Sequence, residues 1–241
     1  MRLSIIIRTW DRLEYTIRAI ISIERNCGIP KEDYEIIVVD MGSEDGTRQW
    51  LFYNQFGFYR IQSVVPLTEN IGDGKGMQMG IQMARGEFIA QHDNDIELDH
   101  PGYYAKLIEL YEKLETSGHR VCAIGGAPVQ GPSLDDAPMR FGKQRYEGNQ
   151  GIKCGTHHLY QVAWVRAAFV FRQRFTEVAF GAGMCNSWCG EWFDRGYENL
   201  LDVDAKWWHI DSSPKGAEYV KRQFEKHPKY DHVKKHYSRF I

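Results

Sequence analysis

The sequence predicts an α/β fold in which a mostly parallel, twisted sheet is flanked by helices within a single domain. Short apolar runs alternate with segments whose apolar residues recur at helical period, which is the pattern of β-α-β units. The runs are continuously apolar, as expected of strands that are buried on both faces. With 241 residues, the chain is long enough for one large domain with a substantial core.

Five apolar runs in the first half of the chain are expected to be strands, with helices between them. The first run is 3–7, and Asp11 with Glu14 at capping-box spacing starts a helix that Gly28 and Pro30 end. The other expected strands are 34–40, 59–65, the run that starts at Phe88, and 121–126; the other expected helices lie around Trp50, after the glycine-rich loop 70–76, and from Pro101.

The second half follows this alternation less closely. Residues 127–155 are rich in Pro, Gly, Asp and Gln without periodicity, which predicts a long loop that shapes a lid or a substrate wall. A strand is expected over 159–171, a short helix over 186–195 and a strand over 200–210. Residues 214–241 predict a surface helix with a tail. Its apolar stripe is narrow, so contact with a membrane or an acidic partner is the alternative interpretation.

Composition limits the classes of function. The chain has 30 basic and 32 acidic residues, so it lacks the strong positive field of a nucleic-acid-binding protein. Five cysteines in a chain of this length indicate free thiols in a reducing compartment. No apolar stretch approaches the roughly 18 residues of a membrane span, and the N-terminal run is too short for a signal peptide. The sequence therefore predicts a cytoplasmic protein.

Two carboxylates one residue apart, Asp93 and Asp95, end the run that starts at Phe88. Side chains at i and i+2 of an extended chain point the same way, and open α/β sheets bind ligands at the carboxyl ends of their strands. The pair can therefore bind one hard cation and leave room for a phosphate. An isolated D-x-D is more often a strand-end turn with solvated acids, so the interpretation needs support from the rest of the chain.

Four stretches supply that support, because they resemble in order the motifs of one enzyme family. Residues 5–12 (IIIRTWDR) resemble the family's first strand and TYNR turn, and residues 37–47 (IVVDMGSEDGT) resemble its VVDDGSxDGT stretch, from which Met41 departs. Residues 70–89 resemble its glycine-rich loop and helix, and 93–95 stand where its D-x-D belongs. The family is the GT-A fold nucleotide-sugar glycosyltransferases, family 2. The resemblance is good over 3–125 and weaker as far as His209.

This resemblance implies a reaction and its participants. The expected activity is metal-dependent transfer of a sugar from a nucleotide-diphosphate sugar, UDP- or GDP-linked, to a glycan or other hydroxyl acceptor, with Mn²⁺ or Mg²⁺ as cofactor. Within one domain it implies a donor-binding half at 1–126, an acceptor-binding and catalytic half at 127–212, and a C-terminal tail at 213–241.

The resemblance also assigns residues. Trp10 would stack on the base of the nucleotide, and Asp40 would accept a hydrogen bond from the base or the ribose. Lys75 would reach a phosphate beside the start of the helix. The metal ligands would be Asp95 and His209, with Asp93 on ribose, a bound water or the metal itself. The implied nucleotide-sugar site as a whole comprises Thr9, Trp10, Asp11, Asp40, Asn70, Lys75, Asp93 and Asn94.

The catalytic base is less clearly marked. Counting back from Gly196 places the family's acidic pair at Met184 and Cys185, which carry no acid. Glu191 is the alternative candidate, with Asp194 second, because an inverting transfer needs a carboxylate to take the acceptor proton. Inversion is expected, and a retaining mechanism is the alternative.

Three other functions remain open at this stage. Cys154, His157, His158, Cys185 and Cys189 could build a zinc site, although their spacing matches no standard knuckle and packed thiols are the simpler interpretation. A binding module that has lost its base would bind nucleotide without turnover. A sugar nucleotidyltransferase also pairs such a sheet with D-x-D, but it would need a phosphate loop directly after the first strand.

Overall fold

The computed structural model describes residues 1–57, 59–129, 152–154, 157–162, 164–180 and 185–209. The strands in these ranges join one sheet, in the order β3-β2-β1-β4-β9-β6-β10-β8-β7, with β5 paired to β10. Their bounds are β1 Leu3–Thr9, β2 Tyr34–Asp40, β3 Ile61–Pro66, β4 Phe88–Asp93, β5 Ile96–Leu98, β6 Val121–Pro128, β7 Ile152–Cys154, β8 His157–Gln161, β9 Ala168–Arg172 and β10 Glu198–His209.

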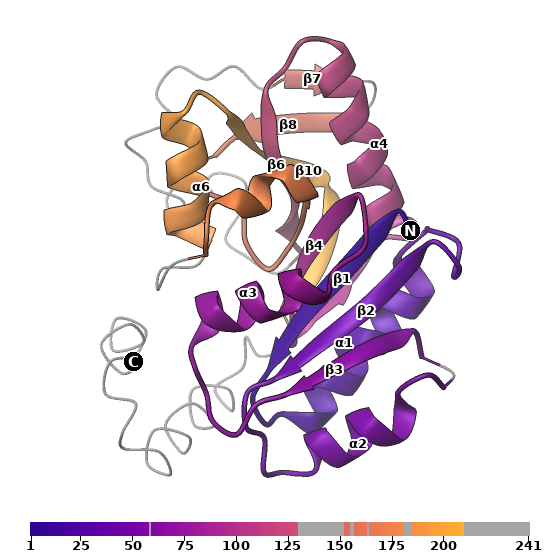
Figure 1. The fold of residues 1–241 in the computed structure, drawn as a ribbon. Coiled ribbons are helices and arrows are strands. Elements are labelled where there is room, and N and C mark those ends of the chain that lie inside the picture. The colour runs from indigo at the N-terminus through magenta and orange to yellow at the C-terminus, as the bar shows by residue number, and fades with distance from the viewer. Residues whose placement is uncertain (58, 130–151, 155–156, 163, 181–184, 210–241) are drawn as a thin grey trace.

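Helices cover both faces of this sheet (Figure 1). They are α1 Leu13–Asn26, α2 Thr47–Asn54, α3 Asp73–Met83, α4 Tyr103–Thr116 and α6 Cys185–Asp194, with a 3₁₀ turn at Gln173–Glu177. On one face α4 packs its Tyr111 ring edge-on against Phe88, with ring centroids 5.2 Å apart. On the other face Trp188 of α6 packs against Phe171 of β9, with centroids 4.7 Å apart. The result is the three-layer arrangement of an α/β domain.

The strands of the first half run as the apolar pattern predicts. β1 pairs in parallel with both β2 and β4, and β2 pairs in parallel with β3. Every residue of β1 and β2 is buried, as expected for strands that helices cover on both sides. The prediction of a helix-flanked sheet is confirmed, and its first half is parallel as expected. The sheet as a whole is mixed, because β5, β7, β8 and β9 pair antiparallel with their neighbours among the described strands.

The expected strand over 159–171 is wrong, because it is two strands. β8 pairs antiparallel with β10, whereas β9 inserts antiparallel between β4 and β6. Between them Ala167 has a positive φ of 66°, a conformation that interrupts an extended chain. Because β9 belongs to the second half of the chain and lies between two strands of the first half, both halves share one sheet.

The capping role expected of Asp11 is also wrong. α1 starts at Leu13, and its N-cap residue Arg12 is left-handed with no side-chain cap. Asp45 from the next loop accepts the Leu13 N–H instead, at 3.0 Å. The Asp11 carboxylate accepts the backbone N–H of Glu44 at 2.7 Å, so it joins two loops rather than capping its own helix.

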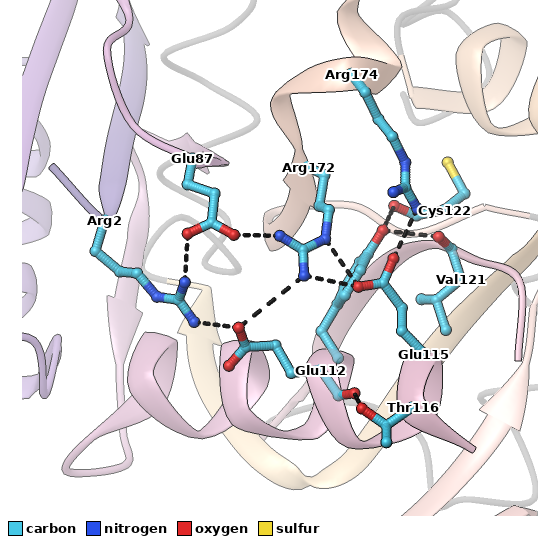
Figure 2. A network of polar contacts seen from close by, with 10 residues as sticks. Arg2, Glu87, Glu112, Glu115, Thr116, Val121, Cys122, Arg172 and Arg174 are labelled. Atoms are coloured by element: carbon cyan, nitrogen blue, oxygen red, sulfur yellow. Dashed lines mark hydrogen bonds and ion pairs between the residues drawn. The ribbon is translucent and has the colours of Figure 1, made fainter. Parts of the chain in front are cut away.

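A network of arginines and glutamates ties α4 to the amino edge of the sheet (Figure 2). Arg2 bridges Glu87 and Glu112, and Arg172 bridges Glu87 and Glu115. Arg174 joins at Glu115, with nitrogen and oxygen 2.6 Å apart. This network lies beside the starts of β1 and β4, at the edge of the sheet opposite to the carboxyl ends of these strands.

The predicted tail, 213–241, and most of the loop expected at 127–155 lie outside the described residues. Within the described ranges, no helix is both long and apolar enough to cross a membrane. All five cysteines are free thiols.

Two helical glycines allow a matched test of the packing between α3 and the sheet. A Cβ at Gly80 would lie 2.4 Å from Cγ2 of Ile6, whereas a Cβ at Gly190 would meet nothing within 4 Å. Alanine is favoured over glycine inside a helix by about 1 kcal/mol. We expect Gly190→Ala to stabilise the fold by up to about 1 kcal/mol, and Gly80→Ala to destabilise it by about 1–3 kcal/mol through overpacking. Urea unfolding measures both; equal stabilisation would contradict the tight α3–β1 contact.

Candidate active site at the carboxyl edge of the sheet

The carboxyl ends of β1, β2 and β4 lie level with one another. Thr9 pairs in register with Asp40, and Arg8 pairs with Asp93. The polar residues that end these three strands therefore meet at one edge of the sheet, which is where open α/β sheets bind ligands.

Asp93 is held by two side chains from the sheet itself. Its Oδ1 accepts from Arg8 Nη2 and from Gln91 Nε2, each at 2.6 Å. Burial raises the pKa of Asp93 to about 6, and the carboxylates of Asp95 and Asp73 add to this effect, while Arg8 opposes it. A buried arginine at the end of an apolar strand is costly unless it is paired, so Arg8 and Asp93 fix one another.

Asp95 is held by residues from two distant segments. Its Oδ2 accepts from Arg12 Nη1 at 2.8 Å and lies 3.4 Å from His209 Nε2. Burial disfavours the charged form, but the hydrogen bond and charge of His209, together with Arg12, outweigh it and lower the pKa of Asp95. Asp95 is therefore a carboxylate at neutral pH.

The strand β5 explains how His209 reaches this edge. β5 pairs antiparallel with the end of β10, and His209 lies opposite Ile96. Trp208 donates from Nε1 to the Asp99 carboxylate at 2.5 Å and holds the same end of β10. The sequence offered no strand at 96–98, yet this three-residue pairing brings the predicted histidine to the predicted aspartate.

Asp95 and His209 fit a divalent cation. Two adjacent ligands of a six-coordinate ion with bonds of about 2.1–2.2 Å lie about 3 Å apart, close to the 3.4 Å between Asp95 Oδ2 and His209 Nε2. Asp93 is not a third ligand of this pair, since its ligand atoms do not lie within 4.8 Å of both others. Among the described residues, that distance is met by His157, Asp202 and Asp204, a separate group. Asp93 instead faces Arg8 and Gln91.

Thr9 and Asn94 build a hydrogen-bonded layer beneath the edge. The Thr9 hydroxyl is buried, donates to the Asp11 carbonyl at 3.0 Å and lies 2.8 Å from the Thr16 hydroxyl. Asn94 Nδ2 donates to Thr9 Oγ1 at 3.1 Å. Trp10 is half-buried and packs against the core. Thr9, at the end of β1, is thus hydrogen-bonded to Asn94 in the turn that also carries Asp95.

Asp40 and Asp11 are both joined to the loop after β2. Asp40 is fully buried, and its Oδ1 accepts the Ser43 N–H at 3.0 Å while Oδ2 accepts from Arg48 Nε at 2.5 Å. The Ser43 hydroxyl accepts the Asp11 N–H at 2.7 Å. Asp40 therefore orders the turn into α2, and Arg48 is its counter-ion.

The glycine-rich loop delivers the start of α3 to the same edge. Asn70 Oδ1 accepts the Gly72 N–H at 2.9 Å, which closes the turn before the helix. Lys75 is exposed in the first turn of α3. A Cβ at Gly76 would lie 2.9 Å from Met41 Sδ, so Met41, the residue that departs from the family motif, packs directly under the glycine loop.

Helix α6 reaches the site with its first residue. Cys185 Sγ lies 3.5 Å from Gln91 Oε1, and the Nε2 of the same side-chain amide donates to Asp93. Glu191 is exposed and its Oε1 pairs with Arg195 at 2.8 Å, and Asp194 is also exposed. Six residues separate Cys185 from Glu191, which is about 9 Å along a helix axis.

The zinc arrangement considered for the cysteines is not found in the described residues. Cys185 and Cys189 are buried within α6, and burial raises the pKa of the Cys189 thiol to about 12. His157 lies on β8 and contacts Asp202 instead of a thiol. These cysteines pack as small apolar side chains.

Sequence reasoning missed four residues of the site: Arg8, Arg12, Arg48 and Gln91. Arg8 and Gln91 each interrupt an apolar strand shortly before its carboxyl end, which is a signal that can be read from sequence. Arg12 and Arg48 stand on a turn and a helix, and nothing local distinguishes them from solvated arginines.

The model of the family described as "Glycosyl transferase family 2" matches residues 4–175, well over half of the chain. The chain belongs to glycosyl transferase family 2. Its fold is the GT-A fold of solved glycosyltransferases, which include a mannosyltransferase, PcManGT, from Pyrobaculum calidifontis in complex with GDP-Man and Mn²⁺. That structure has a TM-score of 0.64 and 18% identity, with 92% of this chain and 60% of the other covered. TarS from S. aureus, in complex with UDP-GlcNAc, has a TM-score of 0.58 and 17% identity, with 88% and 61% covered.

Curated relatives of this family 2 chain match it over shorter stretches. The uncharacterized glycosyltransferase YfnE of Bacillus subtilis is 33% identical over 116 residues, which are 48% of this chain and 28% of the relative. The dolichyl-phosphate beta-glucosyltransferase of Homo sapiens is 40% identical over 68 residues, 27% of this chain and 21% of the relative. The chain thus spans less than a third of the length of either protein.

A cation bound at Asp95 would compete with Arg12 for the same carboxylate oxygen, Oδ2. We expect Arg12→Gln to bind Mn²⁺ about tenfold more tightly in the absence of nucleotide, because a positive charge next to the ligand is removed. Isothermal titration calorimetry measures the affinity.

Arg18→Gln is the matched control, because Arg18 stands on α1, the helix that Arg12 precedes, and pairs with Glu97 at 2.7 Å. Its Mn²⁺ affinity should equal that of the wild type. A weaker affinity in Arg12→Gln would contradict the competition, and a weaker affinity in His209→Gln is expected.

Proposed function

We propose that this family 2 chain is a metal-dependent glycosyltransferase that moves a sugar from a nucleotide-diphosphate sugar to a glycan or other hydroxyl acceptor with inversion. The observation that carries the proposal is the pairing of Asp95 with His209, 3.4 Å apart at the carboxyl edge of the sheet, beside the start of α3. A UDP- or GDP-sugar is the proposed donor, since solved structures of the same fold hold UDP-GlcNAc and GDP-Man.

In this proposal the donor lies between the D-x-D turn and α3. Asp95 and His209 would hold Mn²⁺ or Mg²⁺, which would supply positive charge near the leaving diphosphate. The first amides of α3 and the exposed Lys75 bind the same phosphates, because a helix N-terminus and an ammonium group both favour anions. Trp10, Thr9, Asp11 and Asp40 bound the nucleoside, and Arg48 holds Asp40 in place.

The remaining donor contacts come from the loop and the turn. Asn70 closes the glycine-rich loop that carries Lys75, and Asn94 joins Asp95 to the Thr9 layer. Asp93 is held by Arg8 and Gln91, and it is proposed to accept a hydrogen bond from the ribose or from a water molecule bound to the cation. These assignments follow the family resemblance, and the common position of the residues at one sheet edge supports them.

Transfer requires one proton acceptor. The acceptor oxygen attacks the anomeric carbon, its proton passes to a carboxylate, and the bond from the anomeric carbon to the diphosphate breaks. Glu191 is proposed as this base and Asp194 as the second candidate, because they are the carboxylates of α6, whose first residue contacts the D-x-D through Gln91. Five free thiols support a reducing, cytoplasmic location for the reaction.

Donor turnover across UDP-, GDP- and dTDP-sugars, with Mn²⁺ or with EDTA, tests the metal and names the donor. We expect Asp95→Asn to lower kcat/KM about 10²–10³-fold, since an electrostatic contact to developing charge is lost. If the chain binds nucleotide but turns over no donor, the result would support a binding module. Release of pyrophosphate from a nucleoside triphosphate and a sugar phosphate would support a nucleotidyltransferase. Absence of nucleotide binding would contradict the proposal.

Glu191→Gln against Glu177→Gln tests the base. Both carboxylates pair with Arg195, at 2.8 Å and 3.6 Å, so both variants disturb that arginine. We expect Glu191→Gln alone to lose about 10²–10⁴-fold in kcat while donor affinity is kept. Full activity in Glu191→Gln assigns the base to Asp194 or supports retention, which the anomeric configuration of the product distinguishes.

A further inference from the structure

A second group of metal-ligating side chains lies where β8 pairs with β10. His157 of β8 and Asp202 and Asp204 of β10 place one ligand atom each within 4.8 Å of the others. Gly125 of β6 pairs with Phe169, and both face the α6 side of the sheet. Asp202 pairs with the next residue of β6, Gly126. Because successive residues of a strand face opposite sides, Asp202 faces the α4 side. The group is therefore separated from Asp93 by the sheet.

The backbone of β10 is shaped to hold these carboxylates. The register with β6 shifts between Asp202 and Lys206, which is a bulge of the kind that re-aims side chains. Through it the Asp204 N–H donates to Asp202 Oδ1 at 3.0 Å, and the His158 N–H donates to Asp204 Oδ2 at 3.0 Å. Two main-chain donors thus orient both carboxylates toward His157.

The charge of Asp202 is compensated differently from that of other buried acids. Asp202 has no exposed surface, and its Oδ2 lies 2.7 Å from His157 Nδ1. No arginine or lysine in the described ranges pairs with it, whereas Glu35 pairs with Arg85 at 2.6 Å. A buried carboxylate is costly without a cation, and a second carboxylate beside it increases that need.

We propose that His157, Asp202 and Asp204 bind one divalent transition-metal ion of the zinc class through one ligand atom each. Imidazole nitrogen combined with carboxylate oxygen suits Zn²⁺, whereas Mg²⁺ and Ca²⁺ take oxygen ligands alone. His158 Nδ1 lies 3.3 Å from Asp204 Oδ2, so His158 helps to position Asp204 without belonging to the group of three ligand atoms.

The proposed ion can enter the site from solvent, and its binding would stabilise one end of the sheet. The side chains of His157 and Asp204 are 27% and 47% exposed, so an ion reaches the group from solvent, while Asp202 closes its inner side. β8 carries β7 at the end of the sheet. The ion therefore clamps the β7–β8 hairpin to β10 and stabilises this end of the sheet.

Zn²⁺ titration of the full chain tests the site, in an Asp95→Asn/His209→Gln background that removes the cation ligands of the carboxyl edge. We expect one Zn²⁺ per chain by calorimetry and a rise in the unfolding midpoint of about 5 °C at saturating Zn²⁺. His157→Gln and Asp204→Asn should each weaken binding at least tenfold. Asp204 is exposed, so its variant reports on the site even where His157→Gln disturbs folding.

His119→Gln is the matched control. His119 forms a single histidine–carboxylate pair with Glu198 at the start of the same strand, 3.0 Å apart, and its loss should leave Zn²⁺ affinity and stoichiometry unchanged. Absence of Zn²⁺ binding in the background variant, or binding that His157→Gln and Asp204→Asn leave unchanged, would overturn the proposal.

Discussion

The register in which β1 lies parallel to β4 is the constraint on which the rest of the structure depends. It places Leu3 opposite Phe88 and Arg8 opposite Asp93. A shift by one residue would turn the apolar side chains of β1 to the wrong faces and would move the buried guanidinium of Arg8 away from its carboxylate. Apolar burial and charge pairing therefore select the same register, and the carboxyl edge is built as a consequence.

The second constraint is the short pairing of β5 with the end of β10. It joins a turn near residue 95 to a strand more than a hundred residues later, and His209 reaches Asp95 through it. Because β9 also crosses back between β4 and β6, the second half of the chain completes both the core and the edge of the first. The strands that carry the proposed donor-side residues, and the strands against which α6 packs, thus belong to one continuous sheet.

Buried charge marks the places where the sheet is more than a scaffold. Asp40, Asp93 and Asp95 each have an arginine partner at the carboxyl edge, and all three are expected to meet the donor. Asp202 has a histidine in that position. The difference agrees with the two sites proposed above, one for phosphate and a hard cation and the other for a softer metal ion.

The sequence by itself determined the parallel strands of the first half, the helices between them and the position of the D-x-D, because burial on both faces and helical period are local patterns that one segment carries alone. The tertiary structure decided the split of 159–171 into β8 and β9, the capping of α1 by Asp45, and the partners of Asp93, Asp95 and Asp202. Each of these depends on a contact between segments that lie far apart in the chain. No local pattern specifies such a contact, since its energy exists only when the two segments are packed together.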